Sequence, residues 1–349
     1  MAFMVLEDLK MEENKRILIT GVKKAEIVDT PMPAAAGVWA VVKVRAIPLC
    51  TEYKGWLTGS HYPGHEAAGE VVEVSGPGSK VQVGDRVVVM PQNPCGVCDL
   101  CKAGEYIHCQ DTCDFQAETG LDTNGDTHVR YLPKQDWLLI KIPDGMPFDL
   151  AALACCGLGP TFGALETLNA GVFDTVLITG AGPVGLGGVV NARYRNAKVI
   201  SVDPIKYRRE KALELGANLA IDPDNCDIQA TIKEFTGGYG VTAALETSGT
   251  NGGARICVDA LRPRGKMAFI GENGEFLIRI SDDFIRKGIT VIGQWHYNLN
   301  GTGRILEVIQ NSPAAAKLIT HRFPASKINE ALAISAEHQC GKIIIDPWN

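Results

Sequence analysis

The stretch TVLITGAGPVGLGGVV, residues 175–190, decides the fold of this 349-residue chain. A short apolar run leads directly into Gly180, Gly182 and Gly185, a G-x-G-x-x-G pattern that opens a helical stretch. In such a turn the first glycine permits the tight bend, the second lets the backbone approach a pyrophosphate, and the third allows close helix packing. The helix N-terminus attracts phosphate charge. The stretch therefore predicts a dinucleotide site formed by Gly180, Gly182, Pro183, Val184 and Gly185.

The next strand-like run supports this interpretation. AKVISVD, residues 197–203, ends in Asp203, about 20 residues after the glycines, where a carboxylate can accept hydrogen bonds from free ribose hydroxyls. The same charge repels a 2′-phosphate, so we expect NAD rather than NADP, although Lys206, Arg208 and Arg209 follow closely. Asp203 can also cap the helix that begins near Pro204. Taken alone, the glycine pattern occurs as well in methyltransferases and in turns that bind nothing.

Outward from this motif, the chain divides into regions of different pattern. From about residue 175, strand-like runs alternate with helical stretches, which predicts a parallel sheet with helices on both faces. The first 150 residues are rich in Val, Gly and Pro and read as short strands with long loops, as in a β-barrel-like domain. The tail has helical stretches at 304–312 and 328–336 and a closing strand at 341–347. A chain of this length is expected to form two domains.

Composition limits the possible functions. A net charge of −6 without a basic run argues against nucleic-acid binding and favours small-molecule chemistry. No run approaches the roughly 20 apolar residues of a membrane span. The first residues, MAFMVLEDLKMEENKR, are acidic where a signal peptide is basic, so we interpret them as a short extension of a cytoplasmic protein. Its eleven cysteines should then stay reduced, which favours metal ligation over disulfides.

Four of these cysteines lie together in NPCGVCDLCKAGEYIHC, residues 93–109. Their spacing is C-x2-C-x2-C-x7-C, and glycines between them allow the chain to bend. Four thiolates can complete a tetrahedral zinc shell without another ligand, which is typical of a structural site. An iron-sulfur cluster is the alternative, but the x7 gap does not fit ferredoxin spacings. We therefore predict a structural zinc on Cys95, Cys98, Cys101 and Cys109.

A second possible metal site begins in PLCTEYKGWLTGSHYPGHEAAGEV, residues 48–71. Cys50 and His65 are two candidate ligands, and a catalytic zinc usually has three protein ligands and one open position. Cys155 and Cys156 lie just before the nucleotide-binding region, so a thiolate from there would place the metal at the junction of the domains. Each residue taken singly can also be an ordinary core residue.

The order of these motifs resembles a known family. Cys50, GHEAAGEVVEV, VGDRVVV, the four-cysteine loop, GAGPVGLG and ALELGA follow one another as in the zinc-containing medium-chain dehydrogenases/reductases, in the alcohol, polyol and threonine dehydrogenase branch. The resemblance runs from about residue 16 to the C-terminus. It implies an α/β two-domain fold, with a GroES-like, β-rich catalytic domain and a Rossmann domain built on a doubly wound parallel sheet. We place the limits at 1–156, 157–299 and 300–349, the last segment returning to the catalytic domain.

The resemblance also assigns roles to residues. It implies that Cys50 and His65 bind a catalytic zinc, with Glu66 as ligand or supporting carboxylate and Cys156, followed by Gly157, as the third protein ligand. It further implies two zinc ions per chain, a small-molecule alcohol as substrate, and a homodimer or homotetramer. The positions that match segments bordering the cofactor are Thr161, Arg208, Thr247, Ser248 and Gly271.

One departure concerns the proton relay. The family commonly has Cys-Gly-Ser/Thr-Asp after the first ligand, whereas this chain has Cys50-Thr51-Glu52-Tyr53. Either Thr51 holds the relay position, or Glu52 occupies it as a carboxylate that acts as base or binds the metal when no substrate is present.

The substrate is predicted from the polar and aromatic residues expected near the cleft. These are Trp56, His61, His296 and Tyr297, which could bind a polyhydroxylated molecule or could instead hold a domain or subunit interface. We expect a polyol, a cyclitol or a sugar-derived secondary alcohol, with a simple aliphatic alcohol or an amino alcohol such as threonine as the alternative. The alternatives of another class are a methyltransferase and a non-catalytic nucleotide-binding protein that holds only the structural zinc.

Overall fold

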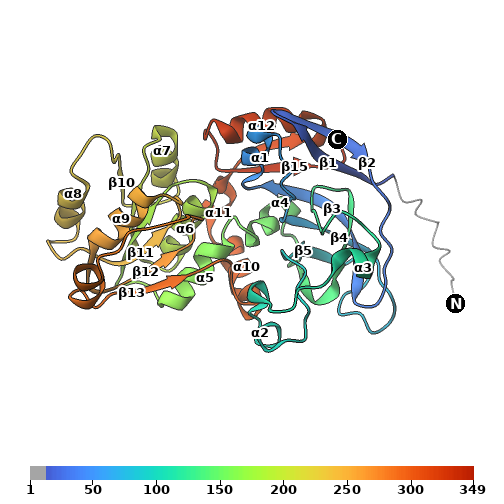
Figure 1. Ribbon diagram of the computed structural model, residues 1–349, viewed down its shortest axis with the longest axis horizontal. Helices are drawn as coiled ribbons and strands as arrows, with labels where there is room; N and C mark the ends of the chain where they lie inside the picture. The colour runs from blue at the N-terminus through green and yellow to red at the C-terminus, as the bar shows by residue number, and fades with distance from the viewer. Residues whose placement is uncertain (1–12) are drawn as a thin grey trace.

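The computed structural model describes residues 13–349, which form two large sheets joined by a helical middle layer (Figure 1). The first sheet of interest is wholly parallel, with six strands in the order β10-β9-β8-β11-β12-β13. Its strands are β8 (Thr175–Thr179), β9 (Lys198–Val202), β10 (Leu219–Ile221), β11 (Val241–Glu246), β12 (Leu261–Phe269) and β13 (Thr290–Gly293). The chain starts at the central strand β8, adds β9 and β10 on one side, and then adds β11, β12 and β13 on the other. This is the strand order of a doubly wound Rossmann sheet.

Helices lie on both sides of the parallel sheet (Figure 1). The strands are buried on both faces, and for that reason β8 and β9 read as unbroken apolar runs. The helices of this part are α5 (Gly159–Leu168), α6 (Pro183–Tyr194), α7 (Lys206–Glu214), α8 (Ile228–Phe235) and α9 (Asn251–Ala260). Because α6 begins directly after β8, its N-terminus points out at the carboxyl edge of the sheet.

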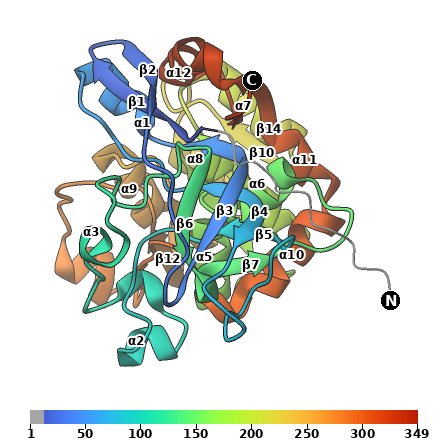
Figure 2. The same cartoon turned by 90° about the vertical axis from the view of Figure 1, so that its right-hand side faces the viewer.

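The second large sheet belongs to the β-rich part and combines both ends of the chain. Its order is β14-β15-β3-β4-β5-β7, with β6 paired to β3. Figure 2 views the molecule from this side, with β3, β4, β5 and β6 in front. The strands are β3 (Trp39–Leu49), β4 (Ala67–Glu73), β5 (Arg86–Val89), β6 (Tyr131–Gln135), β7 (Leu139–Lys141), β14 (Ile319–Pro324) and β15 (Lys342–Asp346), and β1 (Lys15–Gly21) and β2 (Lys24–Asp29) form a separate hairpin.

The C-terminal return is fixed by the pairing of β15 with β3, in which Ile344 lies opposite Pro48. This pairing brings Lys342 of the last strand close to the segment that follows β3. The remaining helices are α1 (Glu52–Thr58), α2 (Asp99–Lys102), α3 (Phe115–Thr119), α4 (Phe148–Ala151), α10 (Thr302–Asn311), α11 (Pro313–Leu318) and α12 (Ile328–Ala336). One hydrophobic core runs from Met90 and Leu138 in the β-rich part through Phe162 to Val190 of α6, so the two parts share a packed boundary.

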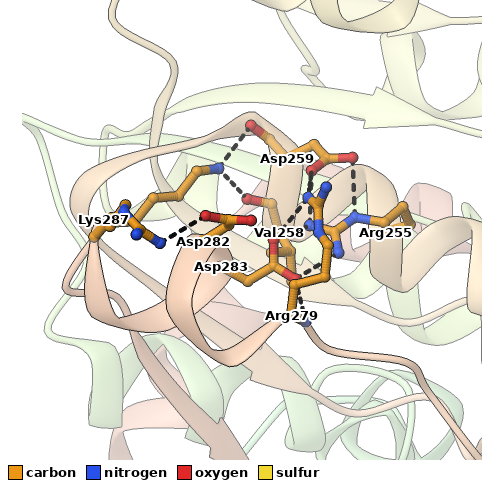
Figure 3. A network of polar contacts seen from close by, with 8 residues as sticks. Arg255, Val258, Asp259, Arg279, Asp282, Asp283 and Lys287 are labelled. Carbon is orange, nitrogen blue, oxygen red and sulfur yellow. Dashed lines mark hydrogen bonds and ion pairs between the residues drawn. The ribbon is translucent and has the colours of Figure 1, made fainter.

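An ion-pair network fixes the segment between β12 and β13 (Figure 3). Arg255 of α9 donates to both oxygens of Asp283 at 2.8 and 3.0 Å and to Asp259, while Arg279 also donates to Asp283. Lys287 donates to the carbonyl oxygen of Val258 at 2.7 Å. Because Asp283 is buried beside two guanidinium groups, its pKa lies well below its usual range. The network holds the last crossover of the parallel sheet against α9.

The predicted α/β two-domain fold is confirmed. The C-terminal strands β14 and β15 join the sheet of the β-rich part, whereas the exact limits at residues 156 and 299 stay a prediction. The structure adds a helix, α1, inside residues 48–71, which the abundance of glycine had suggested to be loop. The helix ends at Gly59, whose φ of 79° favours glycine. The expected N-terminal extension lies, for residues 1–12, outside the described part of the chain.

A search of residues 13–349 finds no single helix long and apolar enough to cross a membrane. By length and composition alone, the bent pair Phe148–Ala154 and Gly159–Leu168, at 41°, passes the same test, although Leu153 and Leu165 of this pair are fully buried in the core.

Candidate active site

Four residues from three separate segments meet at the boundary between the two parts. Cys50 follows β3, His65 and Glu66 precede β4, and Cys156 lies in the turn before α5. One ligand atom from each of the four lies within 4.8 Å of all the others. All eleven cysteines of the chain are free thiols, so the sulfur atoms of this cluster are available to a metal. Two sulfurs, an imidazole and a carboxylate are a ligand set that suits zinc.

Electrostatic coupling in the cluster favours a bound cation. A hydrogen bond from Cys156 lowers the pKa of the Cys50 thiol well below its usual range, and the same bond raises the pKa of Cys156. Burial lowers the pKa of His65, but the charges of Cys50 and Glu52 raise it, and the result is about 10. The cluster therefore concentrates negative charge in a buried place, which a divalent cation would neutralise.

Glu66 is held by partners on both of its oxygens. Its Oε1 accepts from the ammonium group of Lys342, and its Oε2 accepts from the backbone N–H of Cys156 at 3.1 Å. Both side chains of the ion pair are fully buried. Burial raises the pKa of Glu66 to about 7 against the opposing charge of Lys342. Glu66 is thus placed to orient the cluster through Cys156, while Lys342 occupies its Oε1.

Glu52 and Thr51 are placed differently. Glu52 is 2% exposed, and its Oε2 accepts from the backbone N–H of Cys50 at 2.6 Å. Its Oε1 has no hydrogen-bond partner and lies 3.7 Å from Nδ1 of His65. Thr51 is exposed at the N-terminus of α1, and its side chain caps no backbone amide. Of the two residues, Glu52 therefore has a polar atom that is aimed into the cluster without a partner.

The four-cysteine loop forms a second cluster. The sulfur atoms of Cys95, Cys98, Cys101 and Cys109 also lie within 4.8 Å of one another. Backbone amides point at the sulfurs: the N–H of Cys95 donates to Cys109 at 3.2 Å, and the N–H of Cys98 donates to Cys95 at 3.3 Å. Hydrogen bonds from the backbone of Gln110 and then of Cys101 lower the pKa of Cys98 to about 6. Four sulfurs so close together fit a closed, structural zinc shell.

The glycine turn has the geometry that its sequence predicts. Gly180 has a φ of 83°, and a Cβ there would lie 2.6 Å from Cα of Ser248. At Gly185 a Cβ would lie 1.8 Å from the carbonyl oxygen of Gly180. By contrast, a Cβ on Gly182 would meet only the guanidinium of Arg208, at 3.7 Å. The backbone of Gly182 is therefore open to a ligand, as a pyrophosphate site requires, beside the N-terminal residues Pro183 and Val184 of α6.

Asp203 at the end of β9 performs a structural task in the present structure. Its Oδ2 accepts from the N–H of Ala181 at 2.7 Å, and its Oδ1 accepts from the N–H of Ile205 at 2.8 Å. Arg208 lies 3.8 Å from Oδ2. The carboxylate therefore shapes both the glycine turn and the start of α7, and its Oδ1 keeps a lone pair for a further donor.

The other positions expected at the cofactor fall into two groups. Thr247 donates to the carbonyl oxygens of Thr179 and Gly180, Ser248 packs against Gly180, and Gly271 packs against Gly249, so these three lie at the carboxyl edge of the sheet. Thr161 is fully buried, and its hydroxyl donates to Leu158 and accepts from Asn191. This residue fastens α5 to α6 and presents no surface to the cleft, because the tight helix contact around Gly188 covers it.

Two residues that we expected to contact the substrate make structural contacts in the β-rich part instead. Trp56 is buried in the core of the β-rich part, where its indole N–H donates to Asn329 of α12 at 3.0 Å. Nε2 of His61 lies 3.0 Å from Asp126, and its Nδ1 accepts from the N–H of Ile19. The packing of α1 on α12 turns the apolar face of α1 away from the cleft. For Trp56 and His61 the structure therefore supports a structural role.

His296 and Tyr297 do lie near the first cluster, but they are almost fully buried. Nδ1 of His296 is 3.0 Å from the hydroxyl of Tyr106, and its Nε2 has no partner. Burial lowers the pKa of His296 to about 3, with a further contribution from His65. Tyr297 stacks on His296, and its hydroxyl donates to the sulfur of Met90 at 3.7 Å. They form the wall behind the cluster.

Lys342 is a residue of the site that we did not predict from the sequence. The signal is present in GKIIIDP, residues 341–347, where a lysine precedes an apolar run that forms a central strand. A lysine in a buried strand needs a carboxylate partner, which here is Glu66, 276 residues earlier.

Comparison with known proteins agrees with this geometry. The family described as alcohol dehydrogenase GroES-like domain matches residues 36–144, and the family described as zinc-binding dehydrogenase matches residues 183–311. An L-threonine 3-dehydrogenase of Pyrococcus horikoshii is 32% identical over 339 residues, covering 92% of this chain and 94% of that protein. The sorbitol dehydrogenase of Bacillus subtilis is 28% identical over 349 residues, covering 95% and 97%.

The fold has the same relatives. The structure of alcohol dehydrogenase TADH from Thermus sp. ATN1 superposes with a TM-score of 0.85 at 20% identity, covering 95% of this chain and 99% of that one. The two family matches, the full-length relatives and the two cysteine-containing clusters all indicate a zinc-containing dehydrogenase. The chain therefore belongs to the zinc-dependent medium-chain dehydrogenases/reductases, in the group of the alcohol and polyol dehydrogenases.

Proposed function

We propose that this protein transfers a hydride between NAD(H) and a secondary alcohol or its ketone, and that the alcohol is a polyol, a cyclitol or a sugar-derived molecule. The observation that carries the proposal is the convergence of Cys50, His65, Glu66 and Cys156 next to the dinucleotide turn. The carbonyl oxygen of Gly157, which follows Cys156, packs directly on Gly187 of α6, where a Cβ would come within 1.9 Å. A metal held by these residues would therefore lie near the cofactor.

The residues of the cluster would hold zinc in an open shell, with Cys50, His65 and Cys156 as ligands. Bound zinc supplies Lewis-acid stabilisation of negative charge on the substrate oxygen, and bound nicotinamide accepts the hydride. Glu66 orients the ligand set through the N–H of Cys156 and balances the charge of Lys342. Cys95, Cys98, Cys101 and Cys109 would hold the second, structural zinc.

Glu52 is our candidate for the proton acceptor of the alcohol. Its unpartnered Oε1 faces the cluster, while the backbone of Cys50 fixes its other oxygen. A carboxylate in this position can take the hydroxyl proton and release it to solvent through the exposed start of α1. Thr51 is the alternative. Comparing Glu52→Gln with Thr51→Ala separates them, because the relay residue should lower kcat by about 10²-fold and the other should have little effect.

The preference for NAD rests on Asp203, whose carboxylate would meet a 2′-phosphate unfavourably, with Arg208 as the opposing influence. The relatives named for threonine and sorbitol support a secondary alcohol as substrate, and threonine remains the alternative to a polyol. We further expect a homodimer or homotetramer in the cytoplasm, where the free thiols stay reduced.

A metal count combined with a substrate screen tests the proposal. We expect two zinc ions per chain and NAD reduction, followed by the absorbance of NADH, with polyols, cyclitols or amino alcohols. One zinc ion per chain in both the wild type and Cys50→Ser would instead indicate a nucleotide-binding protein that holds only the structural metal. Tight binding of S-adenosylmethionine without binding of NADH would overturn the dinucleotide assignment.

A further inference from the structure

A cavity of about 370 Å³ opens beside the first cluster. Its lining includes Gly64 and His65 of the segment that carries the cluster, together with Met90, Asn93 and Lys134. Thr127 also lines it and donates its hydroxyl to the carbonyl oxygen of Glu66. The cavity therefore leads from a residue of the proposed catalytic metal site to a lysine.

Lys134 is an unusual residue for its position. It lies in the middle of β6, a strand buried along its whole length, and is itself 4% exposed. Its ammonium group donates to the carbonyl oxygen of Gln92 and to Oδ1 of Asn93, the latter at 3.3 Å. Within residues 13–349 no carboxylate forms an ion pair with it. An ammonium group has three donors, so one N–H remains for a partner in the cavity.

The Cys113 thiol, which also lines the cavity, does not supply the missing charge. Burial raises its pKa to about 11, so it stays neutral near pH 7. Burial lowers the pKa of Lys134 itself to about 7. A buried amine without a counter-ion destabilises the fold, and a methionine or leucine would avoid this cost. A polar group that is kept in a cavity despite such a cost is a candidate for ligand binding.

We propose that Lys134 binds an anionic group of the substrate, so that the enzyme acts on a hydroxylated molecule carrying a carboxylate or a phosphate. This inference rests on the proposed function and narrows its substrate class. The carbinol carbon lies at the His65 end of the cavity, and the anionic group accepts the free N–H of Lys134. The side chains of Asn93 and Thr127 also line the cavity, and the Thr127 hydroxyl, which donates to the carbonyl oxygen of Glu66, keeps a lone pair for a hydroxyl group of the substrate.

The reaction is the two-electron oxidation of that alcohol. The carbinol C–H bond breaks and its hydrogen leaves with the electron pair to NAD⁺, which is reduced to NADH. The hydroxyl proton is released to solvent, and the carbon–oxygen single bond becomes the double bond of a ketone. The anionic group takes no part in the bond changes and serves only to position the molecule.

Matched substrates provide the first test on the zinc-loaded enzyme. Sorbitol, gluconate and sorbitol 6-phosphate differ mainly in the presence and the kind of anionic group, and threonine can be compared with 2,3-butanediol in the same way. We expect a lower KM for the anionic member of each set, and the ranking of carboxylate against phosphate identifies the group. Equal or lower KM values for the neutral members would overturn the inference.

Substitution of Lys134 provides the second test. Lys134→Met should raise KM for the anionic substrate by about 10- to 100-fold, the effect of losing one hydrogen bond to a charged group, and should leave KM for neutral alcohols within about twofold. Lys134→Gln, which keeps a donor for Gln92 and Asn93, is used if the first variant does not fold. The matched control is Lys141→Met on β7, which removes an exposed lysine and should change neither KM. An unchanged ratio of the two KM values in Lys134→Met contradicts the inference.

Direct titration separates this inference from the proposed function. Malonate and inorganic phosphate are titrated calorimetrically into the wild type and Lys134→Met, each with saturating NADH. Weaker binding to the variant supports the anion site even where no alcohol is oxidised, in which case the proposed function alone fails. Identical binding to both proteins overturns the anion site whatever the activity.

Discussion

The two cysteine-containing clusters have similar dimensions but different surroundings. In the four-cysteine cluster all ligands come from residues 95–109, and the partners of the sulfurs are backbone amides of the same loop. In the cluster of Cys50, His65, Glu66 and Cys156, the ligands come from three segments, and the partners are buried charges, Glu52 and Lys342. A local loop can form a closed site alone. The cluster of Cys50, His65, Glu66 and Cys156, called the open cluster below, depends on both sheets being in place.

This difference predicts how each cluster responds to substitution. Neutral backbone donors stabilise thiolates without adding an ionisable group, so the four-cysteine cluster should affect stability more than chemistry. Buried ionisable side chains can exchange protons and partners, which a catalytic site requires. The following substitutions test this contrast, from the largest expected effect to the smallest.

Loss of a ligand from the open cluster should have the largest effect on activity. We expect Cys50→Ser or Cys156→Ser to lower kcat/KM by at least about 10⁴-fold, since Lewis-acid stabilisation contributes several kcal/mol to the transition state. Zinc content should fall by one ion per chain while the circular dichroism spectrum stays unchanged. A variant that keeps both its metal and its activity would contradict the ligand assignment.

Breaking the Glu66–Lys342 pair should have the next largest effect, now on stability. Lys342→Met leaves Glu66 fully buried without its partner, and breaking such a buried pair typically lowers the free energy of unfolding by about 3–5 kcal/mol. Denaturant unfolding at equal zinc content measures this. The double variant Glu66→Gln/Lys342→Met should recover much of the loss. If it does not, the single variant acts through packing rather than charge.

Loss of a ligand from the four-cysteine cluster should mainly lower stability. We expect Cys98→Ser to lose one zinc ion and to lower the free energy of unfolding by about 2–3 kcal/mol, with kcat reduced less than about tenfold. The loop is tied to the end of the Rossmann part, because Asn298 donates to Ala103 and Glu105, so a loosened loop should raise proteolysis there. Cys226→Ser, at an exposed cysteine, is the control. A larger loss of activity than of stability would remove the distinction between the clusters.

The same contrast explains what the sequence could predict. The glycine turn and the four-cysteine loop depend on neighbours within about fifteen residues, and both have the predicted geometry. The alternation of strands and helices predicted the parallel sheet for the same reason. Features that depend on distant packing were missed or misplaced. The burial of Trp56 follows from the contact of α1 with α12, and the partner of Lys342 follows from the pairing of β15 with β3.

Thr161 illustrates the same limit within the nucleotide-binding part. The family resemblance implied a place beside the cofactor for this residue, and in the structure the contact of α5 with α6 covers it completely. Lys342 has a recognisable signal, a lysine at the start of an apolar strand, whereas Lys134 lies between Pro133 and Gln135 in a strand of mixed polarity. The signal at Lys342 indicates a buried charge, whereas only the fold shows that one lysine has a carboxylate partner and the other faces a cavity.

The smallest effect that we expect is a pH dependence of stability from Lys134. Burial lowers its pKa from 10.5 to about 7, so between these values the unfolded state binds more protons than the folded state, and stability rises with pH. Between pH 7 and 9 this lysine should add about 2 kcal/mol to the free energy of unfolding. Lys134→Met should abolish that increase and be more stable than the wild type at pH 7, as measured by denaturant unfolding at several pH values. Lys342 itself should cause no such rise between pH 7 and 9, because, despite its burial, the charge of Glu66 raises its pKa. A wild-type stability that is flat from pH 7 to 9 would mean that Lys134 already has a counter-ion. The surroundings of the open cluster would then contain one unpaired buried charge fewer, and they would differ less from those of the four-cysteine cluster.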